Sequence, residues 1–142
     1  MKERQACSTA GTLRLGLRLR SLRAIVELWR DLNQGAPGPA VLINELYVAP
    51  ADSERFVKHW SEIAARLSTC PGFSGSWLHQ AVGHPELWMN YASWSSQAAL
   101  RQALRTSAFR VLVRALPAIA VPRLFRIAVS LQPRSAACQL FG

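Results

Sequence analysis

The order in which strand-like and helix-like segments alternate between residues 40 and 131 constrains the fold more than any other feature. Runs of β-branched, aromatic and aliphatic residues bounded by turn residues predict strands at 41–48, 73–82, 87–94 and 124–131. Apolar residues at helical spacing predict helices at 53–67 and 96–116, the second with a break near Thr106. Pro117 and Pro122 are expected to bound a connector before the last strand.

The predicted order is β-α-β-β-α-β, which is the order of the ferredoxin-like α+β fold. Because crossover connections are right-handed, this order yields a four-stranded antiparallel sheet with both helices on one face. The opposite face of such a sheet has no cover within one chain. A half-apolar open face is an association surface, so we expect a homodimer packed sheet to sheet.

A Gly- and Pro-rich linker at residues 35–39 ends a basic N-terminal extension, residues 1–39, and separates it from the predicted domain at 40–131. The extension has one helical stripe of apolar residues, namely Leu15, Leu19, Leu22, Val26 and Trp29. Its Leu and Arg residues also alternate from 13 to 19, which would suit a strand. A basic amphipathic helix can lie on a membrane, but we favour an extension that packs loosely on the domain. Residues 132–142 are expected to form an irregular tail.

The composition excludes several classes of protein. The net charge of +9 favours anionic partners, but there is no zinc finger or RNA-recognition signature to indicate nucleic acid. No run of about 18 apolar residues is present, so no transmembrane helix is expected. Cys7, Cys70 and Cys138 are too widely spaced for a zinc site or a disulfide framework. We therefore expect reduced thiols in a cytoplasmic protein without a bound metal.

The segment Asn90-Tyr91-Ala92-Ser93-Trp94 carries the clearest functional signal. Alternate residues of a strand project to the same side, so Asn90, Ala92 and Trp94 share one face of the sheet. A buried amide beside an indole is costly unless its donors and acceptors are used. The pair therefore indicates either a satisfied core network or a pocket.

These residues resemble the antibiotic biosynthesis monooxygenase family of dimeric α/β barrels. The resemblance covers residues 40–131 and rests on Pro71-Gly72-Phe73, on the segment 90–94 followed by Ser95-Ser96-Gln97-Ala98, and on the order of the elements. In finer detail the chain is similar to the cofactor-independent anthrone monooxygenases of aromatic polyketide pathways. This similarity implies a homodimer that oxidises a small aromatic or polyketide-like substrate with O2 and uses no cofactor.

The same resemblance implies a set of site residues. The pocket histidine, strand asparagine, strand tryptophan and helical arginine of that branch, its catalytic groups, fall on His79, Asn90, Trp94 and Arg110. Its pocket tyrosine falls on Leu100, which removes a phenol from the substrate-binding site. From the residues themselves, Trp60 and Trp77 are candidate aromatic walls of that site, and Asn44 is a candidate pocket amide.

Each catalytic candidate suits one step of cofactor-free oxygenation. His79, with an intrinsic pKa of about 6.5, could accept a proton from the substrate. Asn90 and the Trp94 N–H could donate to the resulting oxyanion, at about 3 kcal/mol each in a dry site, and Arg110 could add a positive charge. We therefore predict that amide, imidazole and indole converge on one water-poor cavity.

Each candidate also has a structural interpretation. His79 could be a surface or sheet-edge histidine, and Arg110 could lie on the solvated face of its helix. Asn90 could bond to neighbouring backbone, and Asn44 could be a structural amide. Trp94 could be a core anchor whatever the function.

Two other functions compete with oxygenation. The haem-degrading branch of the family has a functional asparagine that matches Asn44, but its iron-ligating histidine falls at Val113 and its tryptophan at Ala103. Valine cannot ligate iron, so we disfavour haem degradation. The second competitor is a non-catalytic or stress-related binding protein with a vestigial pocket, which the change to Leu100 suggests. A cleft filled by side chains would support it, and an open cavity would count against it.

Overall fold

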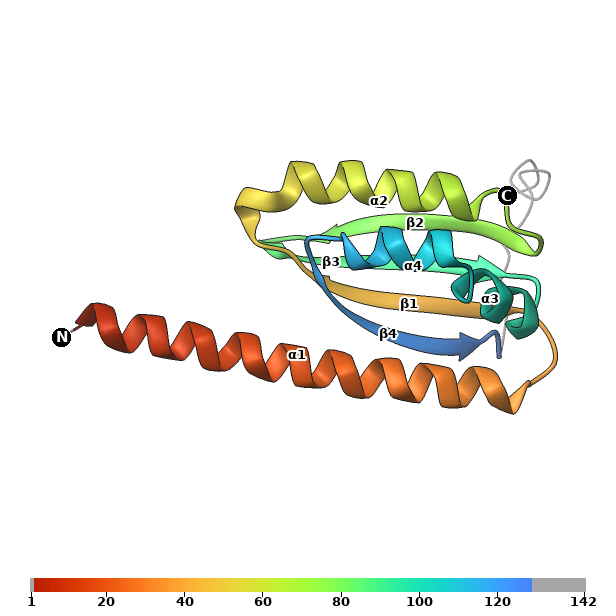
Figure 1. Cartoon of the computed structure of the whole chain (residues 1–142), viewed down its shortest axis with the longest axis horizontal. Coiled ribbons are helices and arrows are strands. Elements are labelled where there is room, and N and C mark those ends of the chain that lie inside the picture. Colours follow the sequence, from red (N-terminus) through yellow and green to blue (C-terminus); the bar gives the residue numbers. More distant parts are fainter. Residues whose placement is uncertain (1, 129–142) are drawn as a thin grey trace, which may run out of the picture.

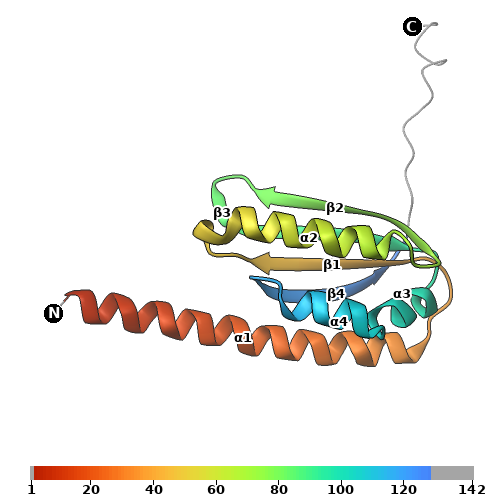
Figure 2. The ribbon, with the colours of Figure 1, turned by 45° about the horizontal axis from the view of Figure 1, so that its top comes forward.

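The computed structural model describes residues 2–128, with side chains from residue 13 onward. Along the chain it has α1 (Lys2–Gln34), β1 (Ala40–Tyr47), a 3-10 turn (Pro50–Asp52), α2 (Ser53–Leu67), β2 (Phe73–Ala81), β3 (His84–Trp94), α3 (Gln97–Leu104), α4 (Ser107–Arg114) and β4 (Ile119–Arg126). The strands form one antiparallel sheet in the order β2-β3-β1-β4, and α2 and α4 lie over the same face (Figures 1 and 2). The predicted ferredoxin-like α+β fold is confirmed.

The motif at residues 71–73 joins α2 to the sheet because Gly72 takes a conformation that side chains disfavour. Its φ is +84°, and an added Cβ would lie 2.5 Å from the Cβ of Ala99 and 2.7 Å from the Oγ of Ser95. The backbone N–H of Ser95 donates to the carbonyl of Gly72 at 2.7 Å. This close approach fixes the end of β3 beside the start of β2.

The predicted break in the second helical region separates α3 from α4. The Ser96 side chain accepts a hydrogen bond from the backbone of Ala99 at the start of α3. The Thr106 side chain accepts one from the backbone of Phe109 at the start of α4. Each cap satisfies a backbone donor that the helix itself leaves free, so one chain segment forms two short helices at an angle.

The last strand begins earlier than the sequence predicts. It spans Ile119–Arg126, so Pro122 lies within β4 and not in a connector. β4 pairs only with β1 and forms one edge of the sheet, where a residue without an N–H is tolerated. Residues 129–131 of the predicted strand lie outside the described part of the chain.

α1 lies along this edge, beside β4 (Figures 1 and 2). From residue 13 onward its buried residues are Ala24, Leu28 and Leu32, and the two leucines belong to the same core cluster as Leu42 and Trp94 of the sheet. Four residues of the predicted stripe are instead exposed, namely Leu15, Leu19, Leu22 and Val26. Apolar residues occur on several sides of this helix, and their spacing alone does not tell which side meets the core. The contacts of Leu28 and Leu32 also contradict loose packing for this half of the helix.

The helices of the described segment do not include one that has both the length and the apolar character needed to cross a bilayer.

Candidate functional site

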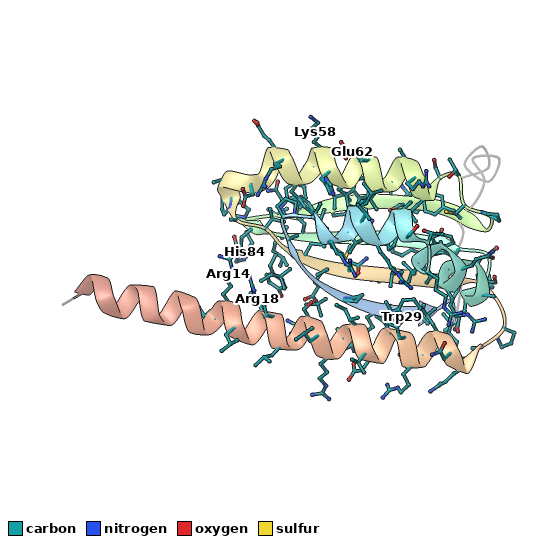
Figure 3. The ribbon with its side chains drawn as sticks, viewed as in Figure 1. Arg14, Arg18, Trp29, Lys58, Glu62 and His84 are labelled. Carbon is teal, nitrogen blue, oxygen red and sulfur yellow. The ribbon has the colours of Figure 1, made fainter. Side chains whose placement is uncertain are left out.

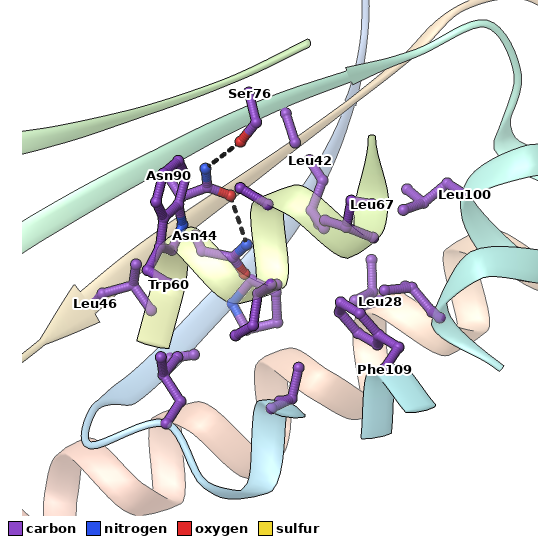
Figure 4. Close-up of a pocket in the computed structure, with 18 of the residues that line it drawn as sticks. Leu28, Leu42, Asn44, Leu46, Trp60, Leu67, Ser76, Asn90, Leu100 and Phe109 are labelled. Atoms are coloured by element: carbon purple, nitrogen blue, oxygen red, sulfur yellow. Dashed lines mark hydrogen bonds between the residues drawn. The ribbon is translucent and has the colours of Figure 1, made fainter. Parts of the chain in front are cut away.

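A cavity of about 500 Å³ lies between the sheet and the helices. The face of the sheet that it touches is here called the inner face, and the opposite one the outer face. β1 and β3 form the floor, α2 one wall, and α3 with α4 another, while α1 closes the β4 side (Figure 4). A volume of this size is typical of small-molecule sites, which are mostly apolar with a few polar groups.

The main polar feature of the floor is a chain of three side chains from neighbouring strands. Asn44 on β1 is directly opposite Asn90 on β3, and its Nδ2 donates to the Oδ1 of Asn90 over a long 3.5 Å. The Nδ2 of Asn90 donates to the Oγ of Ser76 at 2.7 Å and to the backbone carbonyl of Trp77 at 3.2 Å. Figure 4 shows the side-chain links of this chain at the edge of the cavity.

The backbone contact of Asn90 decides what the three side chains offer a ligand. A carbonyl only accepts, so the Asn90 NH2 group must face Trp77, and its Oδ1 faces Asn44. Asn90 therefore has no N–H directed to the cavity, contrary to the role expected from the sequence. The second Nδ2 proton of Asn44 and the hydroxyl proton of Ser76 have no acceptor among the described residues. Asn44 and Ser76 are thus the neutral donors available to a ligand.

The structure brings most of the predicted site residues together. The cavity is lined by Asn44, Trp60, Asn90, Trp94, Leu100 and Arg110. Ser76, Trp29, Ile25, Phe109 and Arg114 also line it and were missed. Ser76 could not be found from strand parity alone, because its face follows from the pairing of Leu78 with Asn90.

His79 and Trp77 do not lie in the cavity. In the β2–β3 pairing Leu78 is opposite Asn90 and His79 is opposite Met89, so His79 projects from the outer face. His79 is exposed, and Trp77 is 53% exposed on that same face. The predicted convergence of imidazole, amide and indole therefore does not occur within one chain.

Trp94 and Leu100 line the cavity but are also central to the core. Trp94 packs edge-on against Phe73, with ring centroids 5.2 Å apart. Its Nε1 is enclosed and has no hydrogen-bond partner among the described residues. The structural interpretation of Trp94 as a core anchor agrees with this environment better than the predicted donor role does.

The charged groups of the cavity are two arginines on α4. Arg110 and Arg114 line it, both are exposed, and neither forms an ion pair with a described acidic residue. The described lining contains no carboxylate, imidazole, thiol, phenol or amine. His59 lies outside it and bonds to the carbonyl of Leu112 at 2.7 Å, which joins α2 to α4. An apolar chamber with cations at its border favours an anionic or acidic ligand.

The described residues also offer no cluster of three or more side chains suited to bind a metal ion. A haem would need an axial ligand, and the position of the haem-degrading branch's histidine is occupied by Val113, which lines the cavity. The residues present do not fit a haem.

Fold and site together define a ferredoxin-like α+β protein with an apolar, ligand-sized cavity between sheet and helices. Residues 39–115, more than half of the chain, match the family described as antibiotic biosynthesis monooxygenase, and the chain belongs to this family. The resemblance recognised in the sequence is thereby confirmed.

Solved structures with the same fold include SnoaB from Streptomyces nogalater, described as a cofactor-independent oxygenase, with 24% identity and a TM-score of 0.62. A candidate monooxygenase from Shewanella loihica PV-4 has 26% identity and a TM-score of 0.57. In both comparisons the aligned region spans 68% of this chain and 100% of the other chain. A candidate antibiotic biosynthesis monooxygenase from Caulobacter crescentus CB15 has 19% identity and a TM-score of 0.60, with 72% and 99% covered. No protein of curated function matches the sequence.

Proposed function

We propose that this protein is a cofactor-independent monooxygenase that oxidises a small aromatic or polyketide-like substrate with O2. The observation that carries the proposal is the open, apolar cavity with the Asn44–Asn90 amide pair in its floor. The description of SnoaB as a cofactor-independent oxygenase supports the reaction class. The open cavity counts against the alternative of a non-catalytic protein with a vestigial pocket, which a cleft filled by side chains would have supported.

The residues of the cavity suit a substrate whose own hydroxyl group is acidic enough to ionise without a catalytic base. A hydroxyaromatic substrate loses its proton to solvent, because the described lining has no side chain to accept it. Arg110 lowers the pKa of the substrate hydroxyl by its positive charge. Asn44 and Ser76 donate hydrogen bonds to the resulting oxyanion, and Asn90 holds Asn44 in position. His79 has no part in this scheme, and Trp60 is an apolar wall.

The electrons come from the substrate. The enolate carbon passes an electron to O2, and the two radicals combine to a peroxide anion, which takes up a proton from water to give a hydroperoxide. Loss of water then leaves a carbonyl, so that a CH2 group and O2 become C=O and H2O. The apolar walls keep bulk water from the charged intermediate.

Oxygen consumption by metal-free and flavin-free protein tests the proposal. With an anthrone we expect one O2 consumed for each quinone formed, at a rate that a chelator leaves unchanged. The control is the same substrate in buffer, since such compounds also oxidise slowly by themselves. A panel of hydroxyaromatic substrates without any rate above this background would contradict the proposal.

We also propose that the protein is a homodimer, with the outer faces of two sheets in contact. Trp77, Met89 and Phe125 are exposed on that face, and the Trp77 ring lies 5.6 Å from that of Tyr91. Exposed aromatic clusters of this kind mark interfaces.

Sedimentation is expected to give twice the chain mass of 15.7 kDa. Trp77→Glu places a charge in the proposed interface, so we expect the dimer dissociation constant to rise at least about 100-fold. Val82→Glu is the matched control, because Val82 lies at the β2–β3 turn and is 99% exposed. A monomeric wild-type protein, or equal effects of the two substitutions, would contradict the dimer.

A further inference from the structure

α1 forms part of the cavity although it precedes the family match. Its residues Ile25, Leu28 and Trp29 line the cavity on the β4 side, whereas the match begins at residue 39. About two thirds of this chain covers the whole of SnoaB and of the Shewanella protein. The wall that α1 supplies is therefore additional to the domain that the chain shares with its family.

Several contacts fix α1 against the domain. The Ser21 hydroxyl donates to the carbonyl of Ala120 on β4. Arg20 pairs with Glu45 at 3.1 Å and donates to the hydroxyl of Tyr47 at 3.3 Å. Burial, and then the Glu45 carboxylate, raise the pKa of Tyr47, so this phenol stays neutral and accepts the bond.

The other end of α1 is held as firmly. Leu28 and Leu32 belong to one core cluster with Trp94 and Leu100. The Arg101 guanidinium of α3 donates to the backbone carbonyl of Leu32 at 3.4 Å. Since contacts hold the helix on both sides of residues 25–29, the fold fixes the backbone from which the Trp29 indole extends.

Trp29 is the largest of the three α1 side chains that line the cavity. It is half-buried and extends from α1 toward the rest of the domain (Figure 3). Trp29 and Phe109 are both partly buried and pack against the core cluster that contains Leu28 and Leu32. A rigid aromatic ring in this position limits how far a planar ligand extends toward β4.

We propose that α1 completes the ligand cavity and that Trp29 determines the size of the ring system it accepts. The inference concerns the site of the proposed function but needs only that the cavity binds an aromatic anion. Trp29→Ala should enlarge the cavity on the α1 side and favour larger rings.

The test compares the binding of naphthalene-1-sulfonate and pyrene-1-sulfonate to the full chain by fluorescence. These anions share a sulfonate that Arg110 and Arg114 can attract, and they differ in ring number. For Trp29→Ala we expect the ratio of pyrene to naphthalene affinity to rise about tenfold, with a smaller rise for Trp29→Phe. Leu22→Ala, an exposed position of the same helix, should leave this ratio within twofold.

The ratio separates a cavity wall from a merely structural residue. General destabilisation weakens both probes equally and leaves their ratio unchanged. An unchanged ratio in Trp29→Ala, or no binding of either probe by the wild-type protein, would overturn the inference. If the ratio changes as expected and no substrate consumes O2, the inference stands and the proposed function fails.

Discussion

Asn44→Ala is expected to lower kcat/KM for oxygen consumption about 100-fold, because it removes the amide donor that faces the cavity. A well-placed neutral donor to an oxyanion is worth about 3 kcal/mol, and each 1.36 kcal/mol corresponds to about a tenfold change in rate. Asn44→Asp should be at least as damaging, since a carboxylate of nearly the same shape has no proton to donate and repels the anion. Initial rates of O2 uptake over a range of substrate concentrations measure both effects.

Asn90→Ala is expected to have a smaller effect, about tenfold, because Asn90 acts only by positioning Asn44 and Ser76. Its own NH2 group bonds to Ser76 and to the backbone of Trp77, and only its Oδ1 reaches Asn44. When Asn44→Ala and Ser76→Ala are already present, adding Asn90→Ala should cause no further loss, because both side chains through which Asn90 acts are gone. A further loss of rate in that triple variant would mean that Asn90 meets the substrate directly.

His79→Ala is the control for these variants. His79 projects from the outer face and does not line the cavity. We therefore expect the rate of oxygen consumption by His79→Ala to stay within twofold of wild type. A loss comparable to that of Asn44→Ala would show that the imidazole takes part in the reaction after all, and would contradict the site described here.

The fold could be predicted because its signals are local. Alternating strand segments, capping residues such as Ser96 and Thr106, and the turn at Gly72 each constrain only their own neighbourhood. The start of β4 was predicted too late in the sequence because Pro122 indicates the end of a strand unless that strand lies at the edge of a sheet. Whether a strand lies at an edge is a property of the whole sheet and not of the local sequence.

The site could be predicted only in part, because it depends on register between strands. The alternation of side chains along β3 correctly placed Asn90 and Trp94 on the same face of the sheet. The face on which His79 lies depends instead on how β2 pairs with β3. Antiparallel pairing about the turn at Gly83 puts Leu78, and not His79, opposite Asn90. No local sequence pattern predicts that α1 lines the cavity, since this arrangement arises from contacts between distant parts of the chain.

The largest expected effect on stability concerns α1. Leu32→Ala should lower the free energy of unfolding by about 3 kcal/mol, because Leu32 is 1% exposed within the core cluster and its truncation leaves a cavity. For a chain of this size that loss corresponds to a decrease in Tm of about 10 °C. Urea denaturation followed by circular dichroism, at one fixed protein concentration, measures the difference.

Leu19→Ala is the matched control, since it makes the same change in the same helix at a residue that is 59% exposed. The gain in helix propensity from leucine to alanine is the same at both positions and cancels in the comparison. We expect Leu19→Ala to change stability by less than about 0.5 kcal/mol. Equal effects at the two positions would mean that α1 does not pack on the domain, and the cavity would then lose its wall on the β4 side.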